Sequence, residues 1–479
     1  MKRPVFTIFF LQLFFSLCAQ NNEFELKVTL KPFKKQYIYL GYYYGKQKPI
    51  IDSVILDDNS FGIFKRAKKL EKGIYLIGYP GKAGYFEVLI DKEQKFSVIA
   101  DTANLLNTIK FAGSPDNVLF ADYQKNTASR GKEIELTKSK RALAKSAADS
   151  AKWEAVIKKS GNEIQEYRDN LIKQNPNSTI AVLLKAMKDP VIPAAEKHPG
   201  GKYDSLYAYR YYKNHYWDNT YFFDERLVRT TFFEEKLDRY FEQLIYPDPD
   251  SVIKEIDWML AYATANDEMQ KFLLAKFANR YIVPKYMWDD RVFVHLFEKY
   301  FSEKNYTWLT EKGKKNIFDR AYSMMANLFG TQAADIELPD STGKTRNLFS
   351  LTDLYTVVLF WDPTCSHCKE TLPRIDSIYK AKWEPAHVKI FAVAKETDGT
   401  KKDWLNFVND HRLDNWVHVY YSKADNDARV NNNIPSYYQL YDVQTVPTLY
   451  LLDKDKRILA KKIPFEQIDE VLQYKLKSQ

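Results

Sequence analysis

A short apolar run followed by two closely spaced cysteines constrains this chain more than any other feature. Residues 356–361 have the length and apolar character of one buried strand, and Cys365 and Cys368 follow after a short turn. The amphipathic stretch that contains Cys368 has the pattern of a helix. The partial positive charge at a helix N-terminus favours thiolate over thiol, and two thiols three residues apart can close a disulfide. The pattern predicts thiol–disulfide exchange.

The length and composition indicate a multidomain globular chain. Its 479 residues exceed what one compact core usually contains, so about three domains are expected. Apolar residues make up 45% of the chain and charged residues 28%. The formal net charge of +9 is mild, and the basic residues are interspersed with acidic ones. We therefore expect an ordinary solvated surface and no nucleic-acid partner.

The first residues have the organisation of a secretory signal peptide. Basic residues open the chain, residues 5–17 are apolar, and the small residue Ala19 precedes a polar stretch. We predict a signal peptide over residues 1–19 and a mature chain in the periplasm or cell envelope. Cleavage after Ala19 would remove Cys18. The alternative is a lipoprotein acylated at Cys18, the one route to membrane association expected here, but Leu17 is bulkier than the usual preceding residue.

After such cleavage the mature chain holds a single pair of cysteines. A long exported protein with one pair, spaced for a small ring, does not use disulfides as a framework. The pair is therefore expected to be reactive rather than structural, with no cofactor beyond the redox-active disulfide Cys365–Cys368.

The pattern of apolar residues changes twice along the chain. Residues 20–115 show short alternating runs typical of an all-β sandwich, and residues 116–329 have the pattern of an all-α domain. Residues 132–174 predict a long helix or a helical hairpin, and the aromatic residues of 203–246 are expected to pack a helical core. The isolated His215 and His295 are expected to be core or surface residues rather than ligands. Residues 330–479 alternate strand and helix, as in an α/β sandwich.

The last third of the chain resembles a known family. The stretch from Phe360 to Lys369, with its two cysteines, and the later Val446-Pro447 resemble the thioredoxin fold of the TlpA/ResA-like cell-envelope family. The resemblance implies an α/β thioredoxin fold and a thiol-disulfide oxidoreductase. The preceding regions resemble the β-rich and helical companion domains of unknown function that often accompany it. Expected partners are thiols or disulfides of envelope proteins, together with an upstream redox partner.

The resemblance also assigns roles to the residues around the two sulfurs. Cys365, at the exposed start of the helix, would be the attacking thiolate, and Cys368 would resolve the mixed disulfide. A protonated His367 between them would favour the thiolate and make the disulfide more oxidising. Pro447 matches the family's cis-proline, which lies against the cysteine pair.

The surface that binds substrate is expected around these residues. The bend at Pro447 would turn the backbone N–H and C=O of Val446 outward, toward an extended substrate segment. Trp361 and Thr364, which flank the turn before Cys365, are expected to contribute to the same surface.

Two carboxylates that serve related proteins are absent. The Glu that TlpA/ResA-like proteins often carry three residues after the second cysteine is Thr371 here, and the buried Asp of cytosolic thioredoxins corresponds to Leu359. Asp362 is the nearest candidate to replace them in proton transfer, since Glu370 is expected to face another side of the helix.

Three other interpretations remain open at this point. A peroxiredoxin-like peroxidase shares the fold but needs Thr or Ser where this chain has Asp362. A non-catalytic envelope scaffold would not require Cys365, Cys368 and Pro447 together. A zinc site is disfavoured, because the cysteines and His367 cannot all face one tetrahedral ion and no second ligand pair exists, so no metal is expected.

Overall fold

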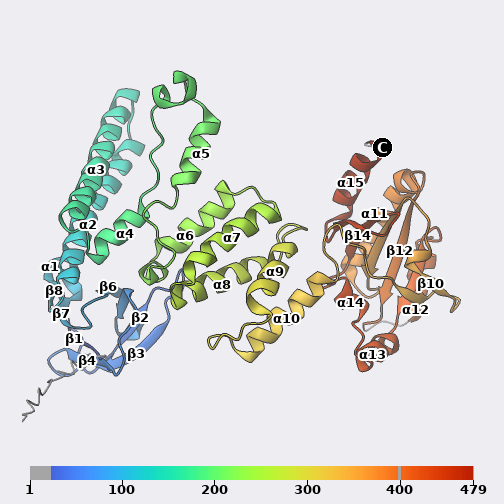
Figure 1. Ribbon diagram of the computed structural model, residues 1–479, viewed down its shortest axis with the longest axis horizontal. Helices are drawn as coiled ribbons and strands as arrows, with labels where there is room; N and C mark the ends of the chain where they lie inside the picture. Colours follow the sequence, from blue (N-terminus) through green and yellow to red (C-terminus); the bar gives the residue numbers. More distant parts are fainter. Residues whose placement is uncertain (1–22, 398–400, 478–479) are drawn as a thin grey trace, which may run out of the picture. The chain divides into compact units, whose positions relative to one another are not determined.

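The computed structural model describes residues 23–397 and 401–477 (Figure 1). The predicted signal peptide and Cys18 lie outside the described residues. The chain forms two compact units. The first comprises the described residues up to Leu244 together with Thr264–Met269, and the second comprises Ile245–Ala263 and the chain from Gln270 onward. The boundary falls inside the helical region, so residues 116–329 are shared between the units.

Two four-stranded sheets open the first unit. One sheet has the order β4-β1-β7-β8, with β1 parallel to β7, and the other has the order β3-β2-β5-β6, with all its strands antiparallel. The strands are β1 (Phe24–Lys31), β2 (Tyr37–Tyr42), β3 (Ile50–Ile55), β4 (Phe61–Arg66), β5 (Gly73–Gly78), β6 (Tyr85–Ile90), β7 (Lys95–Asp101) and β8 (Lys110–Ala112).

One hydrophobic core joins the two sheets. Alternate residues of β1 are buried, because successive side chains of a strand point to opposite faces. Phe24 and Leu26 of β1 share this core with Ile38 and Leu40 of β2 in the other sheet. The predicted sandwich of β sheets is confirmed.

Helices form the rest of the first unit, in green tones in Figure 1. The long helices α2 (Pro115–Ala142) and α3 (Ala147–Gln174) contact each other along a hairpin, one of the two predicted arrangements. The other helices are α1 (Leu105–Thr108), α4 (Thr179–Met187), α5 (Ser205–His215) and α6 (Phe232–Arg239). Tyr216 is fully buried and stacks on Tyr240 with ring centroids 5.2 Å apart, as expected for an aromatic core.

Four helices precede the C-terminal sheet: α7 (Pro249–Ala263), α8 (Asp267–Tyr281), α9 (Asp290–Leu296) and α10 (Glu311–Met325). The isolated histidines of the helical region each pair with one carboxylate. His215 Nδ1 lies 2.8 Å from Asp218 Oδ2, and His295 Nε2 lies 2.9 Å from Asp257 Oδ1. These contacts give both histidines a structural partner.

A mixed five-stranded sheet forms the centre of the C-terminal region, with the order β13-β12-β11-β14-β15. β11 is parallel to β12 and antiparallel to β14. The strands are β11 (Tyr355–Trp361), β12 (Val388–Lys395), β13 (Val417–Tyr421), β14 (Thr448–Asp453) and β15 (Ile458–Lys461), and a separate ribbon pairs β9 (Glu337–Pro339) with β10 (Thr345–Asn347).

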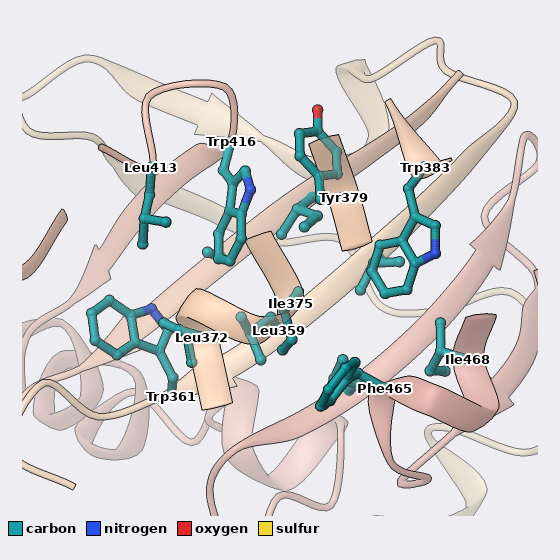
Figure 2. Packing of buried hydrophobic residues seen from close by; sticks show 14 of the residues in the cluster. Leu359, Trp361, Leu372, Ile375, Tyr379, Trp383, Leu413, Trp416, Phe465 and Ile468 are labelled. Carbon is teal, nitrogen blue, oxygen red and sulfur yellow. The ribbon is translucent and has the colours of Figure 1, made fainter. Parts of the chain in front are cut away.

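Both faces of this sheet are covered, since every residue of β11 is buried. Leu359 and Trp361 face one core, which includes residues of α11 and α15 (Figure 2). Val358 and Phe360 face the other core. The helices are α11 (Ser366–Ile378), α12 (Lys401–Asp410), α13 (Lys423–Asn431), α14 (Tyr437–Leu440) and α15 (Phe465–Lys477). The predicted α/β sandwich is confirmed. α13 and α14 were not predicted from the sequence.

A buried ionic network ties the helical part of the second unit to the sheet. Lys461 of β15 forms an ion pair with Asp290 of α9, with side chains 3% and 2% exposed. Lys461 also donates to the backbone and side-chain oxygens of Asn327, at 2.6 and 3.0 Å. Next to it, Asp442 pairs with Arg320 of α10 and with Lys462. These bonds hold α9 and α10 against β15 and the residues next to it.

Removing one partner of this buried pair should destabilise the protein strongly. We expect Lys461→Met to lower the free energy of unfolding by about 3–5 kcal/mol, because it leaves the Asp290 carboxylate buried without its counter-ion. Adding Asp290→Leu should restore a large part of the loss. Denaturant unfolding of both variants provides the measurement.

The exposed pair Lys315–Asp319 supplies a matched control, and Lys315→Met should change the stability by less than about 1 kcal/mol. Equal losses from Lys461→Met and Lys315→Met would contradict the role assigned to the buried pair.

Candidate active site

Cys365 lies at the N-terminus of α11, at the end of the turn that follows β11. Asp362 shapes this turn: its Oδ1 accepts hydrogen bonds from Thr364 N and Oγ1, both at 2.7 Å, and its carbonyl accepts from Cys365 N at 3.1 Å. Cys365 is the N-cap residue of α11, and its sulfur accepts from Cys368 N at 3.4 Å. This bond satisfies one of the N–H groups that a helix leaves unpaired at its N-terminus.

Cys368 occupies the opposite environment one turn into the helix. It is fully buried and belongs to the hydrophobic core that contains Leu359 and Trp361. Burial, reinforced by the neighbouring Cys365 and the charge of Asp362, raises the pKa of Cys368 to about 12. Cys368 is therefore a protonated thiol at neutral pH, while Cys365 is partly exposed.

The loop before β14 lies directly against Cys365. The Val446–Pro447 peptide bond is cis. The Cys365 thiol approaches the Val446 carbonyl, with Sγ and O 3.8 Å apart. Pairing of Phe360 with Thr448 brings this loop beside the end of β11. The antiparallel register of β11 and β14 thus brings Cys365 next to Val446, although the two residues are 81 positions apart in the chain.

The other predicted site residues divide into surface and core. His367 and Thr364 are exposed beside the cysteines. Trp361 is fully buried and packs on Phe407 with ring centroids 5.2 Å apart. The structure assigns the Trp361 side chain to the core instead of the surface that a substrate meets, because it is an inward-facing residue of β11.

Asp362 is poorly suited to accept a proton from Cys368. Burial favours its protonated form, but hydrogen bonds from Thr397 and Thr364 outweigh burial and hold the pKa of Asp362 below its ordinary value. A carboxylate that stays ionised is a weaker base than an ordinary one. Neither Leu359, in the core, nor Thr371, buried on α11, supplies a carboxylate in its place.

Tyr438 of α14 is a residue of this region that sequence reasoning missed. Its hydroxyl oxygen is buried and makes no hydrogen bond within the described part of the chain. Burial, followed by the negative charge of Asp362, raises its pKa above the ordinary value, so the phenol stays protonated. Its ring contacts Phe360 edge-on at 5.5 Å. No local motif marks Tyr438, because the contact arises from packing of α14 against the face of the sheet that carries Phe360.

Beside the cysteine pair opens a cavity of about 570 Å³, lined in part by His367, Thr371 and Pro447. Within residues 23–397 and 401–477, no group of three or more His, Cys, Asp or Glu side chains is placed to hold a metal ion. None of the helices in these ranges is long and apolar enough to span a bilayer.

Comparison with known proteins agrees with this geometry. Residues 353–458 match a family model described as thioredoxin-like, and residues 161–325 match a domain of unknown function, DUF5106. The chain is 30% identical over 149 residues to the thiol-disulfide oxidoreductase ResA of Bacillus thuringiensis (strain Al Hakam), which covers 31% of this chain and 76% of ResA. The chain belongs to the ResA-like family of thioredoxin-like thiol-disulfide oxidoreductases.

Two other proteins are also similar to this chain. The ResA of Bacillus anthracis is 30% identical, with the same coverage of 31% and 76%. A solved thioredoxin-like protein from Bacteroides caccae is 19% identical, covers 60% of this chain and 99% of its own length, and has a TM-score of 0.45. The ResA match covers only the C-terminal third, so the family relationship rests on the region that contains the two cysteines.

The raised pKa of Cys368 makes folding stability depend on pH. In the unfolded chain this thiol ionises near its ordinary pKa, about 8.5, whereas the folded protein keeps the proton up to about pH 12. The stabilisation is therefore complete below about pH 8.5 and is lost as the pH rises toward 12. The difference in unfolding free energy between the reduced wild type and Cys368→Ala should shrink over this window, as measured by denaturant unfolding. A constant difference from pH 7.5 to 10 would contradict the assigned environment.

Proposed function

We propose that this protein exchanges disulfides with proteins of the cell envelope through Cys365 and Cys368, after export directed by residues 1–19. The observation that carries the proposal is the contrast between two sulfurs three residues apart. One caps a helix at the surface and contacts the Val446 carbonyl, and the other is fully buried with a raised pKa. Such a pair suits attack by the first sulfur and resolution by the second.

The exchange conserves atoms and electrons when the substrate contains a disulfide. The Cys365 thiolate attacks one substrate sulfur, the substrate S–S bond breaks, and the departing sulfur takes up a proton. Cys368 then loses its proton and attacks Cys365 Sγ, which releases the second substrate sulfur as a thiol. Two electrons pass from the cysteine pair to the substrate, one of the two protons comes from Cys368 and the other from solvent, and the pair becomes a disulfide. The reverse sequence oxidises a substrate dithiol.

A peroxidase function is less well supported by the geometry. Asp362, where a peroxidase needs a hydroxyl donor, has a pKa below its ordinary value and holds a negative charge close to the cysteines. That charge would repel the oxyanion that develops when a peroxide is attacked. A purely structural role does not account for the partly exposed Cys365, whose sulfur lies beside the Val446 carbonyl.

Replacing the resolving thiol should trap substrates. We expect Cys368→Ser to accumulate covalent adducts at Cys365 when incubated with oxidised envelope extract, because the second exchange step is abolished. Non-reducing electrophoresis and mass spectrometry of the adducts provide the measurement.

Cys365→Ser is the matched control and should form no adducts, since the remaining thiol is buried and protonated. Absence of adducts from Cys368→Ser, or equal adduct formation by both variants, would overturn the proposed exchange. Rapid catalytic consumption of hydrogen peroxide by the wild type would instead favour the peroxidase.

A further inference from the structure

The cavity beside the cysteine pair has a wall contributed by the helical region. Its lining includes residues of α11 and of the loop around Pro447, among them His367, Arg374 and Thr445. It also includes residues 283–287, which connect α8 to α9. All of these residues belong to the second compact unit. A substrate segment that reaches Cys365 through this cavity therefore meets a surface from outside the thioredoxin-like region.

The wall has a defined backbone conformation. Asp289 Oδ2 accepts hydrogen bonds from the backbone N–H groups of Lys285 and Tyr286, both at 3.0 Å. These two bonds close a turn that presents the Lys285 and Tyr286 side chains on the surface, where both are exposed.

The same segment is attached to the body of the unit at both ends. Arg320 Nε donates to the carbonyl of Ile282 at 2.8 Å. Met287 packs against the hydrophobic core that contains Cys368. Asp290, immediately after the segment, forms the buried ion pair with Lys461. The wall is therefore preorganised, so binding a ligand against it carries little ordering cost.

Positive charge prevails along the cavity. Its lining holds five cationic side chains, Lys285, Arg320, Arg374, Lys461 and Lys462, and three carboxylates, Asp290, Asp442 and Glu466. All three carboxylates already form ion pairs with cations of the same lining. No ion pair found within the described residues includes Lys285, whose Nζ lies 5.3 Å from the ring centre of Tyr286. A ligand with negative charge complements this surface.

We infer that residues 283–287 form a specificity wall that selects acidic, extended polypeptide segments around the cysteines of the substrate, with Lys285 as the main charged contact. This inference rests on the proposed exchange function and adds the substrate class to it. Tyr286, 41% exposed, and Val283, 74% exposed, supply apolar surface beside the charge. A small neutral disulfide offers no charge for Lys285 to contact, so the selection applies to polypeptides only.

Two model peptides and one small disulfide test the inference with the full reduced chain. The peptides share a length and one internal disulfide, and carry either Asp or Lys at the same flanking positions. The small probe is neutral 2,2′-dithiodipyridine. We expect the wild type to reduce the acidic peptide faster, and Lys285→Glu to slow that reaction about threefold to tenfold while accelerating the basic peptide. Lys285→Ala should lie between them, and the rate with dithiodipyridine should stay unchanged in all variants.

Lys312→Glu is the matched control, since it makes the same charge change at an exposed position of α10 outside the cavity. Equal effects of Lys312→Glu and Lys285→Glu would overturn the inference, because net charge alone would then explain the preference. Reduction of both peptides at equal rates by the wild type would overturn it too, and would leave the exchange function standing. Failure of the wild type to reduce either peptide disulfide would remove the exchange function and this inference together.

Discussion

The pairing of β11 with a strand on each side determines where both sulfurs lie. All seven residues of β11 are buried, and each large apolar side chain buried in this way stabilises the fold by about 1.5–3 kcal/mol. A register shift of one residue would exchange the two faces of the strand and place Trp361 in the core that now holds Phe360. The strand therefore ends at one place, with the turn to Cys365 beside the start of β14.

That register gives two chemically identical side chains different properties. Cys365 accepts a helix N–H and contacts the loop at Val446, whereas Cys368 is enclosed among apolar side chains. Burial disfavours the charged form of a thiol, so the sulfur inside the helix keeps its proton. The two cysteines have different surroundings because they are three residues apart. This spacing places Cys365 at the end of the helix and Cys368 one turn inside it.

The local features of this site could be predicted from the sequence, whereas the features that depend on contacts between distant segments could not. The apolar run before Cys365 and the helix after it are short-range patterns, so the strand, the turn and the helix start were all predictable. Trp361 was expected at the substrate surface, but the two-residue period of β11 directs it into the core. The wall around Lys285 and the position of Tyr438 could not be predicted, because each arises from packing between segments far apart in the chain.

Differential alkylation of the two cysteines tests the central claim, their contrasting environments, most directly. The reduced, folded protein would be treated with iodoacetamide at pH 7, and modification of each cysteine followed by peptide mass spectrometry. The structure predicts rapid modification of Cys365 and protection of Cys368 until the protein is unfolded by denaturant. Equal rates at the two cysteines in the folded protein, or faster modification of Cys368, would contradict this account.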